Sequence, residues 1–332
     1  MRVGIIGAGA IGGSVAALLS RAGHDVEVTA RGAHLEAIRD HGIVLTGAWG
    51  NFTAAVVANE TLTRAPELVI VATKAQDASE AITQNLAWLG GSPLVVVQNG
   101  LDGSTGARRA SPRSDVIGAL ATYATSFLSP GRITVTTAGP IYLGATDEDD
   151  VPALFAARVL NSVIPTKVIK NFAGAQWTKL VINQVNALPA ITGLSVQEVV
   201  ADPRLRLVMT ASMRETVRIG LGSRVRFGKL QGLGHSGLVL FSRAPLWAGQ
   251  LLPRLMSARI GAVPNPGSTL QSIRRGQATE IDYLNGAVVR AAETIDRQAP
   301  VNALLVALVH EVEASGEFFD ATAVAERYNR IR

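Results

Sequence analysis

The sequence contains no cysteine, and this absence excludes several kinds of chemistry. A chain without thiols forms no disulfide, holds no iron–sulfur cluster or thiolate zinc site, and has no cysteine nucleophile. Charged residues make up only 17% of the chain, and its net charge of +5 includes no long basic run. We therefore expect no nucleic-acid partner, and we interpret the positive balance as a surface that attracts small anionic molecules.

Metal-binding and membrane-spanning patterns are missing too. The five histidines have no metal-ligand spacing, so no metal site is predicted. The most apolar late stretch, residues 237–252, contains Arg243 and Pro245 and is too short to span a bilayer. Glycines interrupt the apolar start of the chain, which argues against a signal peptide. We expect a cytoplasmic protein without a membrane partner.

The pattern of the chain changes near residue 171. Its 332 residues, 48% of them hydrophobic, exceed what one core usually serves, so two domains are expected. Before the change, short runs rich in β-branched residues alternate with helical patterns, and after it helical patterns dominate. The predicted strands are Val3–Ile6, Val26–Thr29, Leu68–Ala72, Leu94–Val97, Val116–Leu120, Ile133–Thr136 and Ile141–Leu143. We predict an α/β fold, with a Rossmann-type doubly wound sheet in residues 1–170 and an all-helical domain in residues 171–332.

Local patterns add further predictions. Ala138-Gly139-Pro140 predicts a hairpin between the last two strands. An exposed acidic loop at 147–150 and a helix at about 152–163 follow. Ala175–Ile191 is predicted as one long helix, kinked at Pro189, and Pro203–Gly220 as another.

A glycine-rich segment directly follows the first predicted strand and opens the first helical pattern. Its residues Gly7, Ala8, Gly9, Ala10, Ile11 and Gly12 form the sequence G-x-G-x-x-G. In this context the glycines allow a tight turn, close approach of a pyrophosphate and close packing of helix on strand. Because a helix N-terminus attracts phosphate, we predict a dinucleotide-binding site here.

The ends of the next strands favour NADP(H) over NAD(H). An NAD site places an acidic residue after the second strand to bind the ribose 2′-hydroxyl, whereas this strand ends in Val28-Thr29-Ala30-Arg31. We predict that Arg31 binds the 2′-phosphate of NADP(H), the alternative being a solvated loop residue. Lys74 either contacts the adenosine phosphate or stays solvated. Asn99, within Gln98-Asn99-Gly100, lies at the same edge of the sheet, or else in a plain turn.

Five segments together resemble the ketopantoate reductase (2-dehydropantoate 2-reductase) family over nearly the whole chain. They are the Gly7–Gly12 loop, Thr73-Lys74-Ala75, Gln98-Asn99-Gly100-Leu101, Trp177-Thr-Lys179-Leu-Val-Ile-Asn183 and Thr279-Glu280-Ile-Asp-Tyr-Leu-Asn285-Gly286. The last two are the most specific and occur in the order that the family requires. The resemblance implies an enzyme of the pantothenate route, which reduces the ketone of a branched 2-oxo acid, 2-dehydropantoate, to a hydroxyl with NADPH.

The resemblance also implies a role for each motif residue. Lys179 is the implied general acid, and burial would lower its pKa for this task. Glu280 would pair with Lys179 and hold the substrate hydroxyl. The implied substrate-binding residues are Asn99, Asn183 and Ser268, with Asn99 also near the nicotinamide. Lys179 and Asn183 are four residues apart, so they share one helix face.

Ser268 and Glu280 serve one small substrate only if the helix between them breaks. Along a continuous helix, twelve residues would separate them by about 18 Å. Gly276 followed by Thr279-x-x-Asp282 predicts that break, with Glu280 in the first turn of a new helix.

Each assignment has a structural alternative. Ser268, with Gln271 three residues later, also fits a helix cap. Lys179 could instead be a lysine whose aliphatic stem packs along an amphipathic helix. Glu280 could instead be an ordinary carboxylate in the first turn of a helix, where the helix dipole favours negative charge.

The chain also departs from the family pattern. The family often has a second asparagine eight residues after the catalytic lysine, where this chain has Ala187, with Asn186 next to it as a substitute. Residues 221–266 are longer and more apolar than the family leads us to expect, and they either reshape the substrate mouth or form a homodimer contact. Two alternatives follow: a reductase of another 2-oxo acid or ketone, and a non-catalytic NADP sensor. The presence of both Lys179 and Glu280 argues against the sensor.

Overall fold

The computed structural model describes residues 1–144, 150–260 and 264–332. These residues form two compact units, Met1–Phe172 and Ala173–Arg332. The first unit is α/β with a mostly parallel sheet and the second is helical, so the predicted fold class is confirmed. The acidic loop predicted at 147–150 lies, except for Asp150, outside the described residues.

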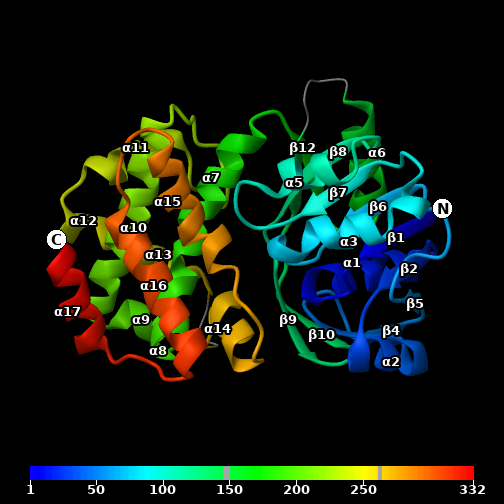
Figure 1. The fold of residues 1–332 in the computed structure, drawn as a ribbon, viewed down its shortest axis with the longest axis horizontal. Coiled ribbons are helices and arrows are strands. Elements are labelled where there is room, and N and C mark those ends of the chain that lie inside the picture. Colours follow the sequence, from blue (N-terminus) through cyan, green and yellow to red (C-terminus); the bar gives the residue numbers. More distant parts are fainter. Residues whose placement is uncertain (145–149, 261–263) are drawn as a thin grey trace. The chain divides into compact units, whose positions relative to one another are not determined.

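The first unit is built on a large sheet and a small one. The strands of the large sheet are β1 (Arg2–Ile6), β2 (Asp25–Thr29), β5 (Val57–Asn59), β6 (Leu68–Val71), β7 (Leu94–Val97), β8 (Val116–Ala121), β11 (Ile141–Gly144) and β12 (Thr166–Ile169). Their order is β12-β11-β8-β7-β6-β1-β2-β5, and all neighbours are parallel except β8 and β11. Figure 1 labels most of these strands. The small sheet has the order β4-β3-β10-β9 and contains β3 (Ile43–Gly47), β4 (Phe52–Ala54), β9 (Ala124–Ser129) and β10 (Arg132–Thr137).

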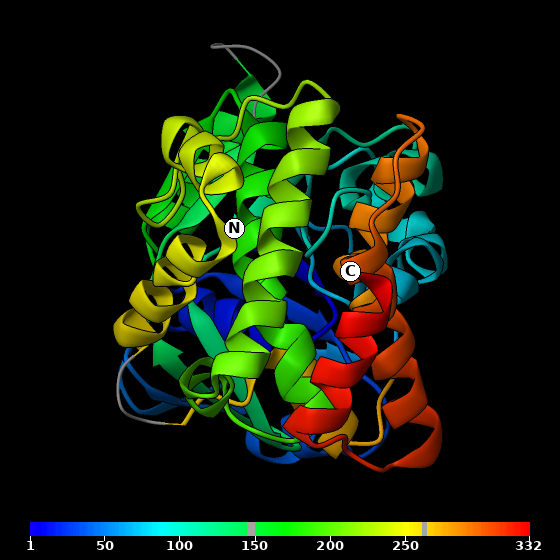
Figure 2. The ribbon, with the colours of Figure 1, turned by 90° about the vertical axis from the view of Figure 1, so that its left-hand side faces the viewer.

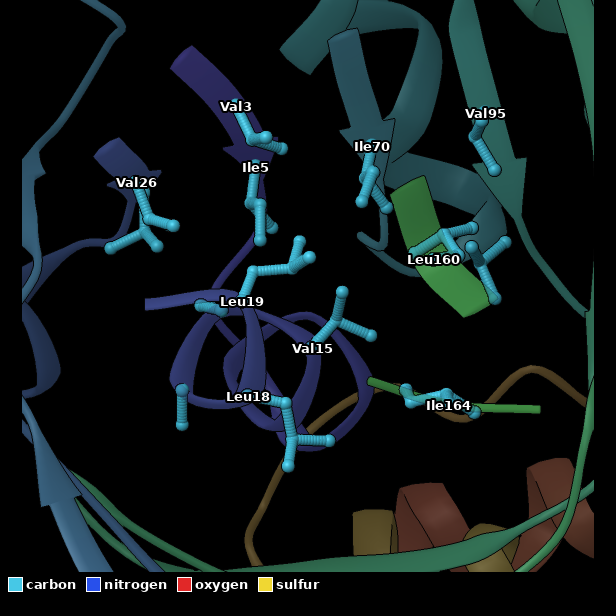
Figure 3. Close-up of a cluster of buried hydrophobic side chains, with 14 of the residues drawn as sticks. Val3, Ile5, Val15, Leu18, Leu19, Val26, Ile70, Val95, Leu160 and Ile164 are labelled. Carbon is cyan, nitrogen blue, oxygen red and sulfur yellow. The ribbon is translucent and has the colours of Figure 1, made fainter. Parts of the chain in front are cut away.

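Helix α1 forms the centre of this unit. The helices and 3-10 turns of the unit are α1 (Ala10–Arg21), α2 (Gly32–His41), η1 (Ala75–Asp77), α3 (Ala78–Gln84), α4 (Leu86–Leu89), α5 (Gly103–Ala110) and α6 (Val151–Asn161). Helix α1 packs against β2 of the large sheet and against all four strands of the small one. Figure 3 shows Leu19 pointing towards Ile5 of β1, while Leu18 points to the opposite side of the helix. Burial on both sides fixes the helix that follows the glycine-rich loop.

The predicted hairpin between Ile133–Thr136 and Ile141–Leu143 is wrong. The first of these strands, β10, pairs with β3 and β9 in the small sheet, whereas β11 pairs with β8 and β12 in the large one. Residues 138–140 therefore cross between sheets instead of turning back. The backbone N–H and the hydroxyl of Thr122 hold this crossing by donating to the Pro140 carbonyl at 3.0 and 2.7 Å.

The second unit is a set of helices and short 3-10 turns. They are α7 (Phe172–Asn183), η2 (Gln184–Asn186), α8 (Ala187–Thr192), α9 (Val196–Ala201), α10 (Pro203–Gly222), α11 (His235–Arg243), α12 (Leu246–Gly249), α13 (Leu251–Ile260), α14 (Gly267–Arg274), η3 (Ile281–Tyr283), α15 (Asn285–Glu293), α16 (Pro300–Ser315) and α17 (Ala321–Ile331). Figure 2 shows α10 as the long central helix of this unit, and it packs against α11, α15, α16 and α17. None of the helices in residues 1–144, 150–260 and 264–332 combines the length and apolarity needed to cross a bilayer.

The prediction of one helix over Ala175–Ile191 is also wrong. Helix α7 ends at Asn183, a 3-10 turn follows, and α8 then begins at Ala187. Pro189 has no N–H to donate to the carbonyl four residues earlier, so the break comes within the turn before the proline. The predicted break between Ser268 and Glu280 is present, because α14 ends at Arg274 and η3 begins at Ile281.

The described part of residues 221–266 contains helices α11, α12 and α13. Their large exposed apolar side chains are Leu240, Trp247, Leu251 and Leu255. A role for this region at the substrate mouth or in a homodimer stays a prediction.

Candidate active site

The glycine-rich loop lies at the carboxyl end of β1 and is held by β2. The N–H of Gly7 donates to Thr29 Oγ1 and the N–H of Ala8 to the Thr29 carbonyl, both at 2.9 Å. Gly7 has a φ of +96°, and a Cβ on Gly12 would collide with the Gly7 carbonyl oxygen. A Cβ on Gly9, in contrast, would meet no heavy atom within 4 Å. The loop thus combines a tight turn, close helix packing and one open approach to the backbone.

Two buried polar atoms near the same edge lack a hydrogen-bond partner among the described residues. They are Thr73 Oγ1, just after β6, and Gln98 Oε1, just after β7. Strand β6 lies between β1 and β7 and is parallel to both, so these atoms and the loop lie at one edge of the sheet. An unpaired buried polar atom is costly, and a polar ligand at this edge would remove that cost. The residues present therefore fit a dinucleotide, with its pyrophosphate at the N-terminus of α1.

The other predicted cofactor residues lie in the first unit, each just after a strand of the large sheet. Arg31 follows β2, is exposed, and donates from Nη2 to Gln84 Oε1 at 2.8 Å. Lys74 follows β6 and Asn99 follows β7, and both are partly buried. Because carboxyl ends of parallel strands line the ligand crevice in such sheets, all three positions suit contact with a dinucleotide.

Two residues that shape the loop were not predicted. The sequence predicts a strand that contains Thr29. It does not predict the contact of the Thr29 hydroxyl with Gly7, because that contact depends on the pairing of β1 with β2. His34 lies on α2, and its Nε2 is 2.8 Å from the Ala8 carbonyl oxygen. Its position three residues after Arg31 was visible in the sequence, but the fold of α2 against the loop was not.

Lys179 and Asn183 lie four residues apart on α7, in the second unit. Lys179 is partly buried, and burial lowers the pKa of Lys179 to about 8. The negative charge of Glu280 acts in the opposite direction, so the structure brings this predicted pair together. A lysine with such a pKa is mostly protonated at neutral pH, yet it gives up its proton more readily than an exposed lysine does.

Glu280 lies one residue before η3 and not within the first turn of a helix, so that prediction is wrong. Side chains of α16 hold residues 279–282 in place. The N–H of Thr279 donates to Glu313 Oε1 at 2.8 Å, and His310 contacts both Glu313 Oε2 at 2.8 Å and Asp282 Oδ1 at 3.1 Å. These contacts on both sides of Glu280 fix the backbone that carries its carboxylate.

Ser268 is exposed in the first turn of α14 and does not cap this helix, whose N-cap residue is Pro266. The capping alternative is therefore wrong. The N–H of Ser268 donates to Asn186 Oδ1 at 3.3 Å, and Asn186 Nδ2 donates to the Asn183 carbonyl at 3.1 Å. The Asn186 amide thus joins the start of α14 to the end of α7. Ala187, at the position of the missing family asparagine, is buried.

A buried polar network connects the two motif segments of the second unit. Asn285 Nδ2 donates to Gln184 Oε1 at 2.7 Å and to Asn302 Oδ1 at 3.0 Å. Ser212 Oγ donates to the same Gln184 oxygen at 2.6 Å. All four side chains are fully buried. Because Gln184 directly follows α7 and Asn285 begins α15, the network fixes the segment before α15 against the end of α7.

Comparison with known proteins assigns the chain to a family. Residues 3–148 match the family described as "Ketopantoate reductase PanE/ApbA", and residues 171–313 match "Ketopantoate reductase PanE/ApbA C terminal". The chain belongs to the ketopantoate reductase family. The resemblance found in its motifs is confirmed, and the protein is an oxidoreductase of the 2-dehydropantoate 2-reductase type.

Individual ketopantoate reductases are similar over their whole length. The 2-dehydropantoate 2-reductase of Pyrococcus horikoshii is 27% identical over 324 residues, which cover 95% of this chain and 99% of the relative. The crystal structure of a PanE/ApbA family ketopantoate reductase from Ralstonia eutropha is 27% identical, with a TM-score of 0.81 over 95% of this chain and 99% of that one. A D-mandelate dehydrogenase in complex with NADH, 18% identical with a TM-score of 0.79 over 95% and 99% of the two chains, shares the fold.

The histidines form no metal site in the part of the chain that the structure describes. No group of three or more histidine, aspartate or glutamate side chains there is arranged to hold a metal ion.

Proposed function

We propose that this protein uses NADPH to reduce 2-dehydropantoate, a 2-oxo acid, to the corresponding 2-hydroxy acid, pantoate. In this proposal residues 1–170 bind NADP(H), and residues 171–332 bind the substrate and carry the proton donor. The observation that supports it most is the pair of Lys179 and Glu280. Burial lowers the pKa of this lysine to about 8, and the nearby carboxylate keeps the pKa from falling further.

The reaction forms one C–H bond and one O–H bond. The reduced nicotinamide supplies, when bound, the hydride that adds to the carbonyl carbon. Lys179 Nζ donates a proton to the carbonyl oxygen as negative charge develops there. Asn99 and Asn183 donate hydrogen bonds near the carbonyl, Glu280 holds the new hydroxyl, and Ser268 binds the carboxylate or an adjacent hydroxyl of the substrate.

The proposed cofactor site uses backbone and side chains of the first unit. The Gly7–Gly12 loop and the N-terminus of α1 would hold the pyrophosphate, and Arg31 would bind the 2′-phosphate that distinguishes NADPH from NADH. Lys74 would contact the adenosine phosphate, and Asn99 would contact the nicotinamide.

Arg31→Ala is expected to weaken NADPH binding much more than NADH binding. Loss of a charge-assisted contact costs about 1.5–3 kcal/mol, so the dissociation constant for NADPH should rise about 10- to 100-fold. Fluorescence titration with each cofactor measures the effect. Gln84→Ala is the control, because Gln84 contacts Arg31 without carrying charge. Equal weakening of NADPH and NADH would contradict the assignment of Arg31.

The rate of 2-oxo acid reduction is expected to fall as the pH rises through the pKa of Lys179, about 8. The sign follows from the role: a general acid works only while protonated, so activity is present below its pKa and lost above it. Glu280→Gln removes the charge that raises this pKa, so the fall should move to lower pH. Glu293→Gln, at an exposed carboxylate on α15, is the control and should leave the profile in place. An unchanged pH profile in Glu280→Gln would contradict the assignment of Glu280 as the carboxylate that raises the pKa of Lys179.

A second candidate function, reduction of a different 2-oxo acid or ketone, is favoured by position 187. Ala187 is buried and carries no polar group, so this chain lacks the second asparagine that the family often has there. Comparing kcat/KM for 2-dehydropantoate with that for a panel of branched, linear and aromatic 2-oxo acids decides between the two. We expect the highest value for 2-dehydropantoate, and a substantially higher value for another acid would favour the second function.

A further inference from the structure

His34 connects the glycine-rich loop to the small sheet of the same unit. Its Nε2 lies 2.8 Å from the Ala8 carbonyl oxygen, and its Nδ1 accepts the N–H of Gly131 at 3.0 Å. A backbone amide only donates, so Nδ1 carries no proton in this arrangement. The proton of the neutral ring is therefore on Nε2, which donates it to the Ala8 carbonyl. The two partners fix both the tautomer and the orientation of the ring.

The direction of the Ala8 carbonyl determines the direction of the next N–H. A trans peptide is planar, so the N–H of Gly9 points opposite to the Ala8 carbonyl. Gly9 is the N-cap residue of α1, and it is also the loop glycine whose missing Cβ leaves open space. The orientation of this one peptide thus decides where an N–H at the helix N-terminus points.

Neighbouring groups keep the His34 ring in place. The ring is partly buried and meets the Phe127 ring of β9 edge-on, with centroids 4.8 Å apart. Gly131 lies in the turn between β9 and β10 with a φ of +73°, a conformation that favours glycine. The ring, which lies on α2, thus contacts the glycine-rich loop at Ala8, strand β9 at Phe127 and the turn before β10 at Gly131.

We propose that His34 is a positioning residue for dinucleotide binding, which holds the Ala8–Gly9 peptide in the orientation that presents the Gly9 N–H to the pyrophosphate. This inference rests on the proposed function, because it requires that the loop binds a dinucleotide. His34 touches neither substrate nor reacting atoms in this role. It acts on cofactor affinity and not on the chemical step.

Protonation of His34 breaks the arrangement. A second ring proton would sit on Nδ1 and face the N–H of Gly131, so the ring would lose this partner. Burial lowers the pKa of His34, and the Ala8 carbonyl acts in the opposite direction. The charged and titratable residues on the elements packed around the ring are all exposed. Those on α2 or directly before it are Arg31, Glu36, Arg39, Asp40 and His41, and Arg132 follows Gly131 at the start of β10. Cofactor affinity should therefore be constant at neutral pH and fall as the pH decreases through the pKa of His34.

The test is the dissociation constant of NADPH between about pH 5 and pH 8, a range chosen to include histidine titration. His34→Leu removes both hydrogen bonds and should weaken binding about tenfold at neutral pH. His34→Gln can accept from Gly131 and donate to Ala8 without titrating, so it should bind within about twofold of the wild type and lose the acid-side fall. The exposed His41 on the same helix is the matched control, and His41→Gln should behave as the wild type does.

Outcomes separate this inference from the proposed function. With saturating NADPH, His34→Leu should keep kcat within about twofold of the wild type while KM for NADPH rises. Wild-type affinity in His34→Leu, or an acid-side fall that persists in His34→Gln, would overturn the role of His34 alone. A wild-type protein that binds no dinucleotide would overturn the proposed function and this role with it.

Discussion

Lys179→Ala is expected to lower kcat for 2-oxo acid reduction by about 10²- to 10⁴-fold, the usual contribution of a general acid. The hydride still has its acceptor in this variant, but no side chain protonates the developing alkoxide. NADPH affinity should change little, because the proposed cofactor contacts lie in the first unit. Steady-state kinetics at equal concentrations of folded protein, together with NADPH titration, measure both quantities.

Two further lysine variants separate proton donation from charge. Lys179→Arg keeps the positive charge near Glu280, but guanidinium gives up its proton too reluctantly to act as the acid, so kcat should stay low. Lys229→Ala removes an exposed lysine of the same unit and should leave kcat unchanged. Near wild-type turnover in Lys179→Arg would show that charge, and not proton transfer, is what position 179 supplies.

Asn285→Asp is expected to lower the free energy of unfolding by about 3 kcal/mol at neutral pH. The substitution preserves shape but replaces the donor that Gln184 Oε1 and Asn302 Oδ1 share with an oxygen. Burial among acceptors would raise the pKa of the new carboxyl in the folded state above its unfolded value. The loss in the free energy of unfolding should therefore be largest at neutral pH. It should shrink as the pH falls through the pKa that the new carboxyl has in the folded state.

Chemical denaturation at two pH values measures this loss. Asn329→Asp, at an exposed position on α17, is the matched control and should cost less than about 1 kcal/mol. A loss in Asn285→Asp no larger than in the control would contradict the account in which this network holds the segment before α15 against α7.

The parallel strands in the core of the first unit could be predicted because each is a hydrophobic run that is visible in the sequence. Leu68–Val71 and Leu94–Val97 are continuous apolar runs, as strands covered on both faces must be. The small sheet could not be predicted in the same way. Phe52–Ala54 is too short for a pattern, and Ile133–Thr136 gives no sign of whether its partner precedes or follows it along the chain. Pairing between distant segments was decided by packing around α1, which no local pattern encodes.

The candidate site was predictable where chemistry depends on residue type and spacing. A four-residue interval on a helix was enough to place Lys179 with Asn183, and Gly276 marked the break that precedes Glu280. The contacts that hold these residues were not predictable, because they join segments far apart in the chain. Asn285 reaches Gln184 across 101 positions, and only the folded helices show that the two side chains meet.

The most direct test of the proposed reaction is to follow the hydride. Wild-type protein would be given 2-dehydropantoate with NADPH deuterated at C4 on either face, and the product would be analysed by mass spectrometry. We expect pantoate carrying one deuterium on its hydroxyl-bearing carbon from one of the two labelled cofactors. No labelled product from either, with the protein folded and NADPH bound, would contradict the proposal that this chain reduces 2-dehydropantoate.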